Sequence, residues 1–324
     1  TFITHGLDEV MAAADSITIL RDGKLAATRE KAHTSVVELA ELMIGRKGES
    51  MVQAAPRTPP QDRVAMSIRD LHVDMPGEEV RGVSLEVYEG EILGIGGLAG
   101  QGKLGIPNGV MSLYDTRGSV TLFGEELKLG NAGDALRAGI AMVSEDRKGV
   151  GLLLDQSIED NIVFNAMQIK GEYLHRLGLF TLKNSSAVRK TAERMIHDLD
   201  IRCFGPMQHT GTLSGGNQQK VCIARALVMG PRFLFVSEPT RGIDIGAKKL
   251  VLETLVRLNR EQGMTIVIVS SELQELKSIS DRIAIISEGR LVDILSPDAS
   301  DADFGLAMSG IKPDDQLEKG DGAQ

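Results

Sequence analysis

Several residue types and segments are scarce in this sequence, and each scarcity excludes a class of protein. The 324 residues include no tryptophan and two cysteines, Cys203 and Cys222, whose spacing fits neither a metal site nor a redox motif. We therefore expect two reduced thiols in the core rather than a framework of disulfides. No apolar run approaches the roughly 18 residues of a membrane-spanning helix, so the sequence predicts none.

The sequence also lacks a concentration of positive charge. Its 36 Lys and Arg residues are outnumbered by 45 Asp and Glu residues, which gives a formal net charge of -9. Binding to nucleic acid requires clustered positive charge, so we expect no nucleic-acid partner. The apolar fraction of 42% is sufficient for a sizeable core.

A repeat relates the two ends of the sequence. The segment THGLDEVMAAADSITILRDGKL near the start resembles SSELQELKSISDRIAIISEGRL near the end. The matched residues are 266 positions apart in each case: Asp15 and Asp281, Gly23 and Gly289, Leu25 and Leu291. By the same offset, His5 corresponds to Ser271. Both copies predict a polar turn, a short helix, a strand, a glycine turn and a further strand.

The repeat predicts the domain organisation. Residues 1–47 are expected to be the C-terminal remnant of a first domain, whose earlier part is missing, since Thr1 begins inside a strand-like stretch. Residues 48–63 lack periodicity and contain prolines, as a linker does. A second copy of the domain is expected over residues 64–310, followed by a polar, disordered tail at 311–324.

A glycine-rich loop follows the apolar segment GEILGIGG. The pattern G-x-x-x-x-G-K-[ST] fits at Gly97, Gly102 and Lys103, but Leu104 stands where a hydroxyl should hold Mg²⁺. Such a loop binds phosphates because its backbone N–H groups converge on one anion, and the lysine adds a point charge. A tight turn between a strand and a helix has the same composition, so this motif alone leaves both interpretations open.

Two further motifs are more specific. In LSGGNQQK, Ser214 and the following glycines begin a predicted helix whose free N–H groups suit an anion, although Ser214 could equally be an ordinary N-cap. In RFLFVSEPTRGID, an apolar strand over 233–236 ends in Ser237 and Glu238. A carboxylate ending this strand helps hold Mg²⁺ in P-loop ATPases. Ser237 occupies that position, and Glu238 is the candidate to polarise an attacking water.

The order of these segments resembles a known family. GLAGQGKL, SEDRKGVGLLL, LSGGNQQK, EPTRGID and SSELQEL together resemble the second half of the tandem ATP-binding subunits of bacterial monosaccharide importers, of the ribose, galactose and xylose types, in the ABC transporter superfamily. The resemblance covers Thr1 to about Gly310. It implies an α/β fold: a P-loop ATPase core with a mainly parallel sheet, an antiparallel β edge near Val73–Glu86 and a helical subdomain near Asp155–Thr212.

The resemblance also implies roles for individual residues. The catalytic residues would be Glu238 and, as the switch histidine of the missing first domain, His5. The nucleotide-binding residues would lie in the Walker A loop, at the Q-loop position, in the signature motif and in the D-loop: Gly97, Gly100, Gln101, Gly102, Lys103, Leu104, Glu145, Ser214, Gly215, Gly216, Asn217, Gln218 and Asp244. Tyr88 is expected to be a packing residue rather than an adenine shelf. No residues are expected to bind a separate metal.

Four substitutions weaken the ATP site of this copy. Leu104 replaces a hydroxyl residue, Ser237 an aspartate, Ser271 the switch histidine and Glu145 the Q-loop glutamine. Leu104 and Ser237 together remove both usual protein contacts to Mg²⁺. The signature motif is intact, and ABC domains enclose ATP head to tail. The resemblance therefore implies that residues 214–218 complete the ATP site of the missing first domain.

The implied function is ATP-driven import of a sugar or related solute, with ATP and Mg²⁺ as cofactors. The expected partners are membrane-spanning permease subunits, the missing first ABC domain and, indirectly, a solute-binding protein. The expected location is the cytoplasmic face of the bacterial inner membrane. Purine-nucleoside importers share much of the pattern, and a non-hydrolytic regulatory half is a second alternative. A soluble ABC protein acting on ribosomes or DNA is a third, which the absence of basic clusters disfavours.

Overall fold

The computed structural model describes residues 7–21, 24–34, 38–39, 42, 62–177 and 180–312. His5, almost all of the expected linker and the tail from residue 313 lie outside this range. Among the described residues, no helix combines the length and the apolar character needed to cross a membrane.

A six-stranded sheet forms the centre of the large domain, in the order β14-β13-β5-β12-β11-β8. Its strands are β5 (Ile92–Gly96), β8 (Ile140–Val143), β11 (Phe233–Ser237), β12 (Thr265–Val269), β13 (Arg282–Ser287) and β14 (Arg290–Leu295). Only β14 runs antiparallel to its neighbour. Every residue of β5, β11 and β12 is buried, which explains their continuous apolar sequences. The prediction of a mainly parallel sheet is confirmed.

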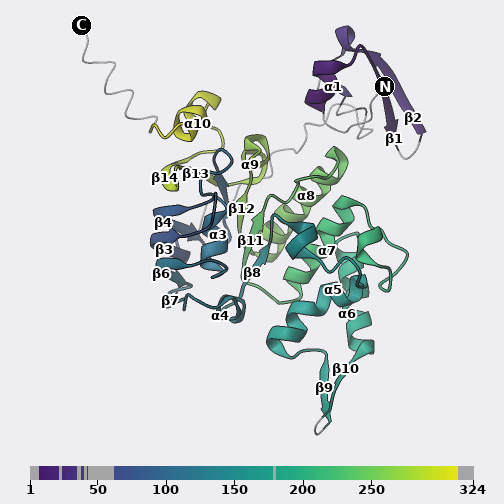
Figure 1. Ribbon diagram of the computed structural model, residues 1–324, viewed down its shortest axis with the longest axis vertical. Helices are drawn as coiled ribbons and strands as arrows, with labels where there is room; N and C mark the ends of the chain where they lie inside the picture. The colour runs from purple at the N-terminus through teal and green to yellow at the C-terminus, as the bar shows by residue number, and fades with distance from the viewer. Residues whose placement is uncertain are drawn as a thin grey trace.

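A second, antiparallel sheet lies beside the first and confirms the predicted β edge (Figure 1). Its order is β4-β3-β6-β7, and its strands are β3 (Val64–Val73), β4 (Val80–Tyr88), β6 (Thr116–Leu122) and β7 (Glu125–Glu126). The helices α3 (Gly105–Val110) and α4 (Ala132–Arg137) pack in the same apolar core as these strands and one face of the parallel sheet. The core between the two sheets thus fixes the chain segments that surround the end of β5.

Helices pack in the apolar core on the other face of the parallel sheet, and α5 to α8 among them lie in teal and green at the right of Figure 1. They are α5 (Ile158–Asn165), α6 (Ser185–Asp198), α7 (Gly215–Leu227), α8 (Ile245–Gln262), α9 (Leu273–Ile279) and α10 (Asp301–Met308). Shorter helical turns are η2 (Arg147–Gly151), η3 (Ala166–Lys170) and η4 (Thr210–Thr212). The expected helical subdomain also contains a hairpin, β9 (Leu174–Leu177) with β10 (Phe180–Lys183), which the sequence did not predict. Cys203 and Cys222 are both free thiols, as expected.

The N-terminal segment has the same secondary structure as the end of the chain. It comprises α1 (Leu7–Ala13), β1 (Ser16–Arg21), β2 (Lys24–Glu30) and η1 (Lys31–His33). Adding 266 to the bounds of α1 and β1 gives the bounds of α9 and β13. The two hairpins even share an irregularity, since the pairing register shifts between Ile19 and Leu20 and between Ile285 and Ile286. The repeat found in the sequence is therefore a repeat of structure.

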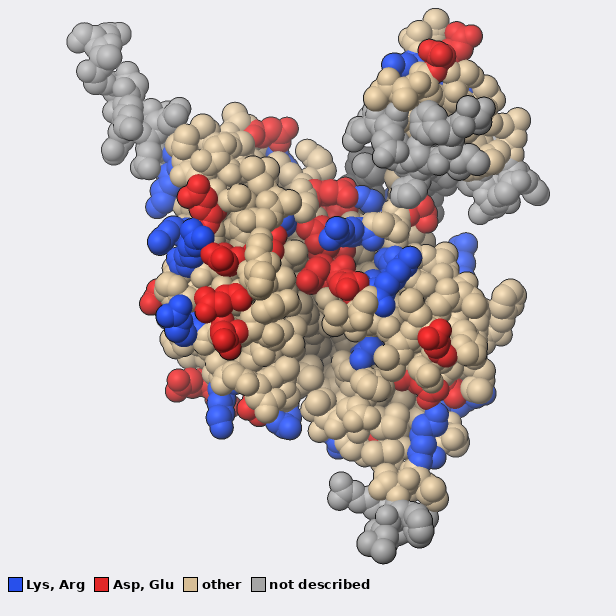
Figure 2. Space-filling model, viewed as in Figure 1, with Lys and Arg blue, Asp and Glu red and all other residues tan. Residues whose placement is uncertain are grey.

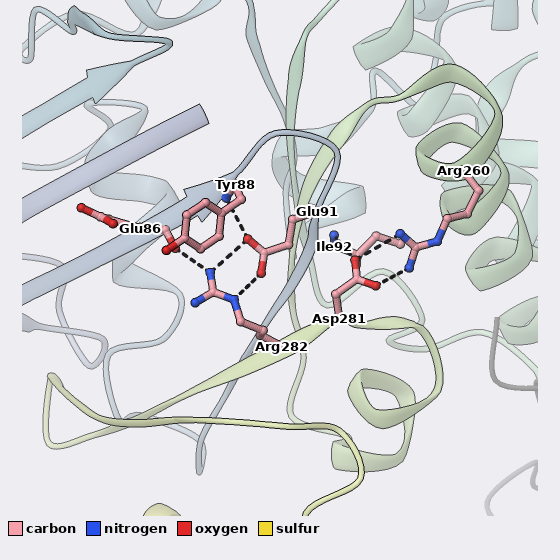
Figure 3. Close-up of polar contacts among 7 residues, drawn as sticks. All are labelled: Glu86, Tyr88, Glu91, Ile92, Arg260, Asp281 and Arg282. Carbon is pink, nitrogen blue, oxygen red and sulfur yellow. Dashed lines mark hydrogen bonds and ion pairs between the residues drawn. The ribbon is translucent and has the colours of Figure 1, made fainter. Parts of the chain in front are cut away.

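Two buried ion pairs hold the start of β5, the strand between β13 and β12 (Figure 3). The Asp281 carboxylate accepts hydrogen bonds from the Ile92 backbone N–H at 2.8 Å and from Arg260 at 2.5 and 3.1 Å. The Arg282 guanidinium binds the fully buried Glu91 at 2.5 and 3.0 Å. It also lies 4.7 Å from the centre of the Tyr88 ring, so Tyr88 is a packing residue as expected.

The Asp281 contacts predict a large loss of stability on substitution. Asp281→Ala leaves the Arg260 guanidinium, 14% exposed, without its partner. Urea unfolding should show a loss of about 3–5 kcal/mol. The control is Arg117→Ala, whose side chain is 76% exposed and 4.0 Å from Asp74; it should cost less than about 1 kcal/mol. Equal losses for the two variants would contradict the structural role of Asp281.

Candidate functional site

The glycine-rich loop connects β5 to α3, as the sequence predicts. Gly100 and Gly102 have φ angles of 74° and 96°, in the region that glycine adopts most readily. Three backbone N–H groups of the loop converge, as the motif requires for binding an anion. They belong to Gly100, Gly102 and Leu104, and all three donate to one carboxylate of the chain itself, that of Glu78.

Glu78 lies in the turn between β3 and β4 and was not predicted as a site residue. Its oxygen atoms accept hydrogen bonds at 3.0, 2.9 and 3.1 Å from the three loop N–H groups. The residue is only 8% exposed. No motif signals this arrangement, because the side chain reaches the loop only after the β3–β4 hairpin has packed against the end of β5.

Other predicted phosphate-binding residues of the loop also have partners within the chain. The Lys103 side chain is 1% exposed, and its Nζ donates to the Leu98 carbonyl at 3.2 Å. Gln101 accepts the Gly289 N–H on its backbone oxygen at 2.9 Å and the Glu288 N–H on Oε1 at 2.7 Å. Leu104 packs against the apolar core between the sheets. The turn between β13 and β14 is thus tied to this loop.

The strand β11 ends at Ser237 and Glu238, as predicted. Ser237 is fully buried, and its Oγ has no hydrogen-bond partner within the described part of the chain. Glu238 has a φ angle of 45°, which is strained for a residue with a side chain. Its Oε1 accepts a hydrogen bond of 2.6 Å from Ser271, the residue at the switch position. The structure therefore brings together two of the residues singled out from the sequence.

The buried carboxylate of Glu275 binds residues that lie close in the chain to Glu238 and Ser271. Glu275 on α9 accepts hydrogen bonds from the hydroxyls of Thr240 and Ser270, the latter at 2.9 Å. Lys248 Nζ lies 3.4 Å away and also binds the more exposed Glu272. Burial raises the pKa of the Glu275 carboxyl. Glu275 thus links the segments that follow β11 and β12, and in the sequence it corresponds to Glu9 of the first copy of the repeat.

The signature residues lie at the N-terminus of α7. Ser214 is exposed and is the N-cap by its backbone, but its Oγ accepts a 3.0 Å hydrogen bond from Asn217 Nδ2 instead of capping the helix. Gln218 is buried and accepts from Arg147 Nε at 3.2 Å. Gly216 lies against α8, since a Cβ there would be 2.5 Å from the Ala247 Cβ. The exposed residue of the motif is therefore Ser214, with Gly215 and Asn217 partly exposed behind it.

Two predicted nucleotide-binding residues have structural roles here. Asp244 is the N-cap of α8 and accepts the Ala247 N–H at 2.9 Å. Glu145 follows β8, is half-buried and accepts a hydrogen bond of 3.3 Å from Ser144. Two residues later, Arg147 binds Gln218 and lies 3.5 Å from the Arg241 carbonyl oxygen. Arg147 belongs to the segment SEDRKGVGLLL, and its hydrogen bond to the signature helix depends on the folded structure.

Comparison with known proteins identifies the family of this chain. The family model described as "ABC transporter" matches residues 80–241, which is half of the chain and runs from the start of β4 to four residues beyond the end of β11. The chain belongs to the ABC transporter family.

Similar proteins of this family come from several bacteria. The ABC transporter chain is 38% identical over 314 residues to the ribose import ATP-binding protein RbsA 2 of Rhizobium meliloti (strain 1021), covering 96% of this chain and 59% of that protein. It is 38% identical over 296 residues to the xylose import ATP-binding protein XylG of Moorella thermoacetica, covering 90% of this chain and 56% of that protein. The chain thus spans little more than half the length of these relatives.

Solved structures of ABC transporter cassettes share the fold. The cassette MJ0796, in a post-hydrolysis dimer bound to ADP and Pi, superimposes with a TM-score of 0.60 at 21% identity, covering 72% of this chain and all of that one. The ADP conformation of the cassette MJ1267 has a TM-score of 0.60 at 17% identity, with 80% and 99% of the two chains covered. These likenesses confirm the predicted P-loop α/β architecture.

The raised pKa of Glu275 predicts a specific pH dependence. The folded ABC transporter chain binds this proton more tightly than the unfolded chain, so the contribution of Glu275 to stability is full below about pH 4.5 and is lost as the pH rises through the folded pKa. Glu275→Gln cannot ionise, so its unfolding free energy should increase relative to wild type as the pH rises above about 4.5. Glu253→Gln, which neutralises an exposed carboxylate of α8, is the control. A difference between Glu275→Gln and wild type that does not change with pH would contradict the role of burial.

Proposed function

We propose that this chain is the C-terminal part of a tandem ATP-binding subunit of an importer for ribose, xylose or a related solute. The relatives named above are import proteins for these sugars, and the chain covers 56–59% of their length. The repeated helix and hairpin support residues 1–47 as the end of a first ABC domain, 48–63 as a linker and 64–310 as a second domain. Sugar is favoured over nucleoside because of these relatives.

The two nucleotide sites of such a subunit would be unequal. ABC domains pair head to tail, so each ATP lies between the Walker motifs of one domain and the signature of the other. In this domain the glycine-rich loop has Leu104 in place of a Mg²⁺ ligand and Ser237 in place of a carboxylate. The signature end of α7 keeps its exposed Ser214 and the free N–H groups of a helix of 13 residues. This contrast is the observation that carries the proposal.

The working site would therefore combine residues of both domains. The preceding domain would hold ATP and Mg²⁺ on its own Walker motifs, with His5 as its switch residue. Ser214, Gly215 and Gly216 would approach the γ-phosphate, and the N-terminus of α7 would stabilise its negative charge. Glu238, hydrogen-bonded to Ser271, would belong to the weaker site. The isolated chain should hydrolyse ATP more slowly than about 1 s⁻¹, the low end of usual turnover.

The permease partner would bind a groove next to the loop that follows Glu145. The groove has a volume of about 600 Å³ and is lined by residues of that loop and of the helices α5 and η3. Its lining includes the apolar residues Leu152, Leu153, Leu154, Phe164 and Met167 and the charged residues Lys148 and Asp155. Leu153 is 40% exposed and Val150 67% exposed. A short cytoplasmic helix of a membrane-spanning subunit fits such a surface, and the bridge from Arg147 to Gln218 connects it to the signature helix. The subunit would thus lie at the cytoplasmic face of the bacterial inner membrane.

The surface charge supports a protein partner rather than nucleic acid. On the face shown in Figure 2, Lys and Arg side chains lie among Asp and Glu side chains instead of forming a continuous stripe. Nucleic-acid binding would require such a stripe.

The unequal sites predict the behaviour of Ser214 variants of the full-length tandem subunit, reconstituted with its permease. Ser214→Asp keeps a good N-cap but places a negative charge against the phosphate, so ATP hydrolysis and transport should fall by about 100-fold or more. Ser214→Asn is the neutral control of the same size and should retain most activity. Lys103→Ala should change activity far less than Ser214→Asp, because it lies in the weaker site.

Ser214 is a cleaner position than Gly215 for this test. A Cβ on Gly215 would lie 3.0 Å from Ile243 Cγ2 and 3.3 Å from the Gly242 carbonyl oxygen of the same chain. If Ser214→Asp and Ser214→Asn behaved alike, or if Lys103→Ala were as damaging as Ser214→Asp, the unequal-site model would be wrong. Thermal melting of all three variants checks that each is folded.

The groove predicts a second pair of variants. Leu153→Asp should reduce co-purification of the tandem subunit with its permease, because a charge would be buried in the contact. Leu113→Asp changes a residue of similar exposure, 49% against 40%, outside the groove lining. It should leave co-purification unchanged. Equal loss for the two variants would reject this groove as the docking site.

A further inference from the structure

We propose that Glu78 is the resident anion of the glycine-rich loop in this domain and closes the loop to nucleotide phosphate. The inference rests on the proposed function only in treating the loop as the weaker of two nucleotide sites. Nothing in the motif indicates it, because a lost Mg²⁺ ligand weakens a site without filling it. The contacts of one side chain show how the loop is filled.

The Glu78 carboxylate occupies the position that the loop offers to an anion. Its Oε1 accepts from the Gly100 N–H at 3.0 Å, and its Oε2 accepts from the N–H groups of Gly102 and Leu104 at 2.9 and 3.1 Å. Hydrogen bonds to an ionised acceptor are stronger than those between neutral groups. A phosphate oxygen that bound these N–H groups would meet a like charge with little water between them, since Glu78 is 8% exposed. The carboxylate and a phosphate therefore exclude each other.

The backbone holds Glu78 in this position. The turn that carries Glu78 and Glu79 packs directly on the loop and the start of α3, as Gly102 and Gly105 show, and on the β13–β14 turn, as Gly289 shows. A Cβ on Gly105 would collide with the Glu78 carbonyl oxygen, and a Cβ on Gly102 with that of Glu79. A Cβ on Gly289 would lie 2.5 Å from the Glu79 oxygen. The turn backbone therefore starts the Glu78 side chain directly beside the loop N–H groups that it binds.

The turn between β13 and β14 adds a third segment to this closure. The Gly289 carbonyl accepts the Arg81 N–H at 2.7 Å, and the Gly289 N–H donates to the Gln101 carbonyl at 2.9 Å. The β3–β4 turn, the loop and the β13–β14 turn thus form one hydrogen-bonded unit. A loop with converging N–H groups and no anion would leave buried donors unsatisfied. Glu78 accepts the hydrogen bonds of three such groups, so they are satisfied within the chain itself.

The neighbouring Glu79 is a matched control. It precedes β4 like Glu78, but its side chain is 55% exposed and pairs with Arg81 at 2.7 Å. Substitutions at 78 and 79 therefore change the charge of the chain equally. Only the substitution at 78 removes an anion from the loop.

The first experiment is a titration of the 324-residue chain with ATP in EDTA, which removes any dependence on Mg²⁺. Wild type and Glu79→Ala should show no binding at millimolar ATP. Glu78→Ala should bind ATP with a dissociation constant at least about tenfold below the highest ATP concentration tested. In Glu78→Ala the Lys103 ammonium group is expected to bind the phosphate of ATP. Adding Lys103→Ala removes this charge, so the double variant should lose the gain in affinity. Wild type binding ATP as tightly as Glu78→Ala would overturn the proposal, and so would a folded Glu78→Ala that gains nothing.

A second measurement decides the matter if Glu78→Ala does not fold. Glu78→Gln keeps the size of the side chain and loses its charge. Amide hydrogen exchange should then accelerate at Gly100, Gly102 and Leu104, and Glu79→Gln should leave these amides unchanged. Equal exchange in both variants would overturn the proposal. Both experiments use this chain alone, so loss of the transport model in the tandem subunit would leave their result intact.

Discussion

The placement of β5 is the constraint on which the rest of this domain depends. Buried carboxylates fix its start, because Asp281 binds both the Ile92 N–H and Arg260, and Glu91 binds Arg282. These contacts join β5 to α8 and to β13 at one end of the sheet (Figure 3). At the other end of the same strand the chain enters the glycine-rich loop. Within the described part of the chain, the ion pairs make no contact with the predicted nucleotide-binding residues, but they position the strand that leads into the glycine-rich loop.

The position of β13 transmits this constraint to the other side of the loop. Arg282 is the first residue of β13, and the turn that follows this strand binds Gln101 through Gly289. The antiparallel sheet supplies the remaining wall, since the β3–β4 turn brings Glu78 to the loop N–H groups. Three N–H groups of the loop are thus bound within its own domain, whereas the N-terminus of α7 leaves Ser214 exposed. One domain combines a closed anion site with an open one.

Much of this fold could be predicted from the sequence, because apolar strands and glycine motifs are local signals. The strand before Gly97, the strand ending at Ser237 and the helix after Ser214 all lie where the patterns indicated. Glu78 could not be predicted, because its role depends on how a hairpin packs on a loop some 25 residues later in the chain. Asp244 was predicted as a nucleotide-binding residue from its place in the D-loop, and in the structure its carboxylate caps the helix α8. The β9–β10 hairpin interrupts a helical region without a glycine or proline signal strong enough to reveal it.

The two copies of the repeated hairpin differ in how far their apolar side chains are buried, and this difference affects the solubility of the purified chain. Leu20 and Leu25 of the first hairpin are 64% and 66% exposed. Their counterparts in the second hairpin, Ile286 and Leu291, pack in the core between the sheets. Among the described residues, the first hairpin therefore presents to solvent the apolar side chains that its twin buries, in a sheet of two strands. Such a surface promotes aggregation, so the purified chain is expected to be most soluble when dilute and to associate through this hairpin rather than through its large domain.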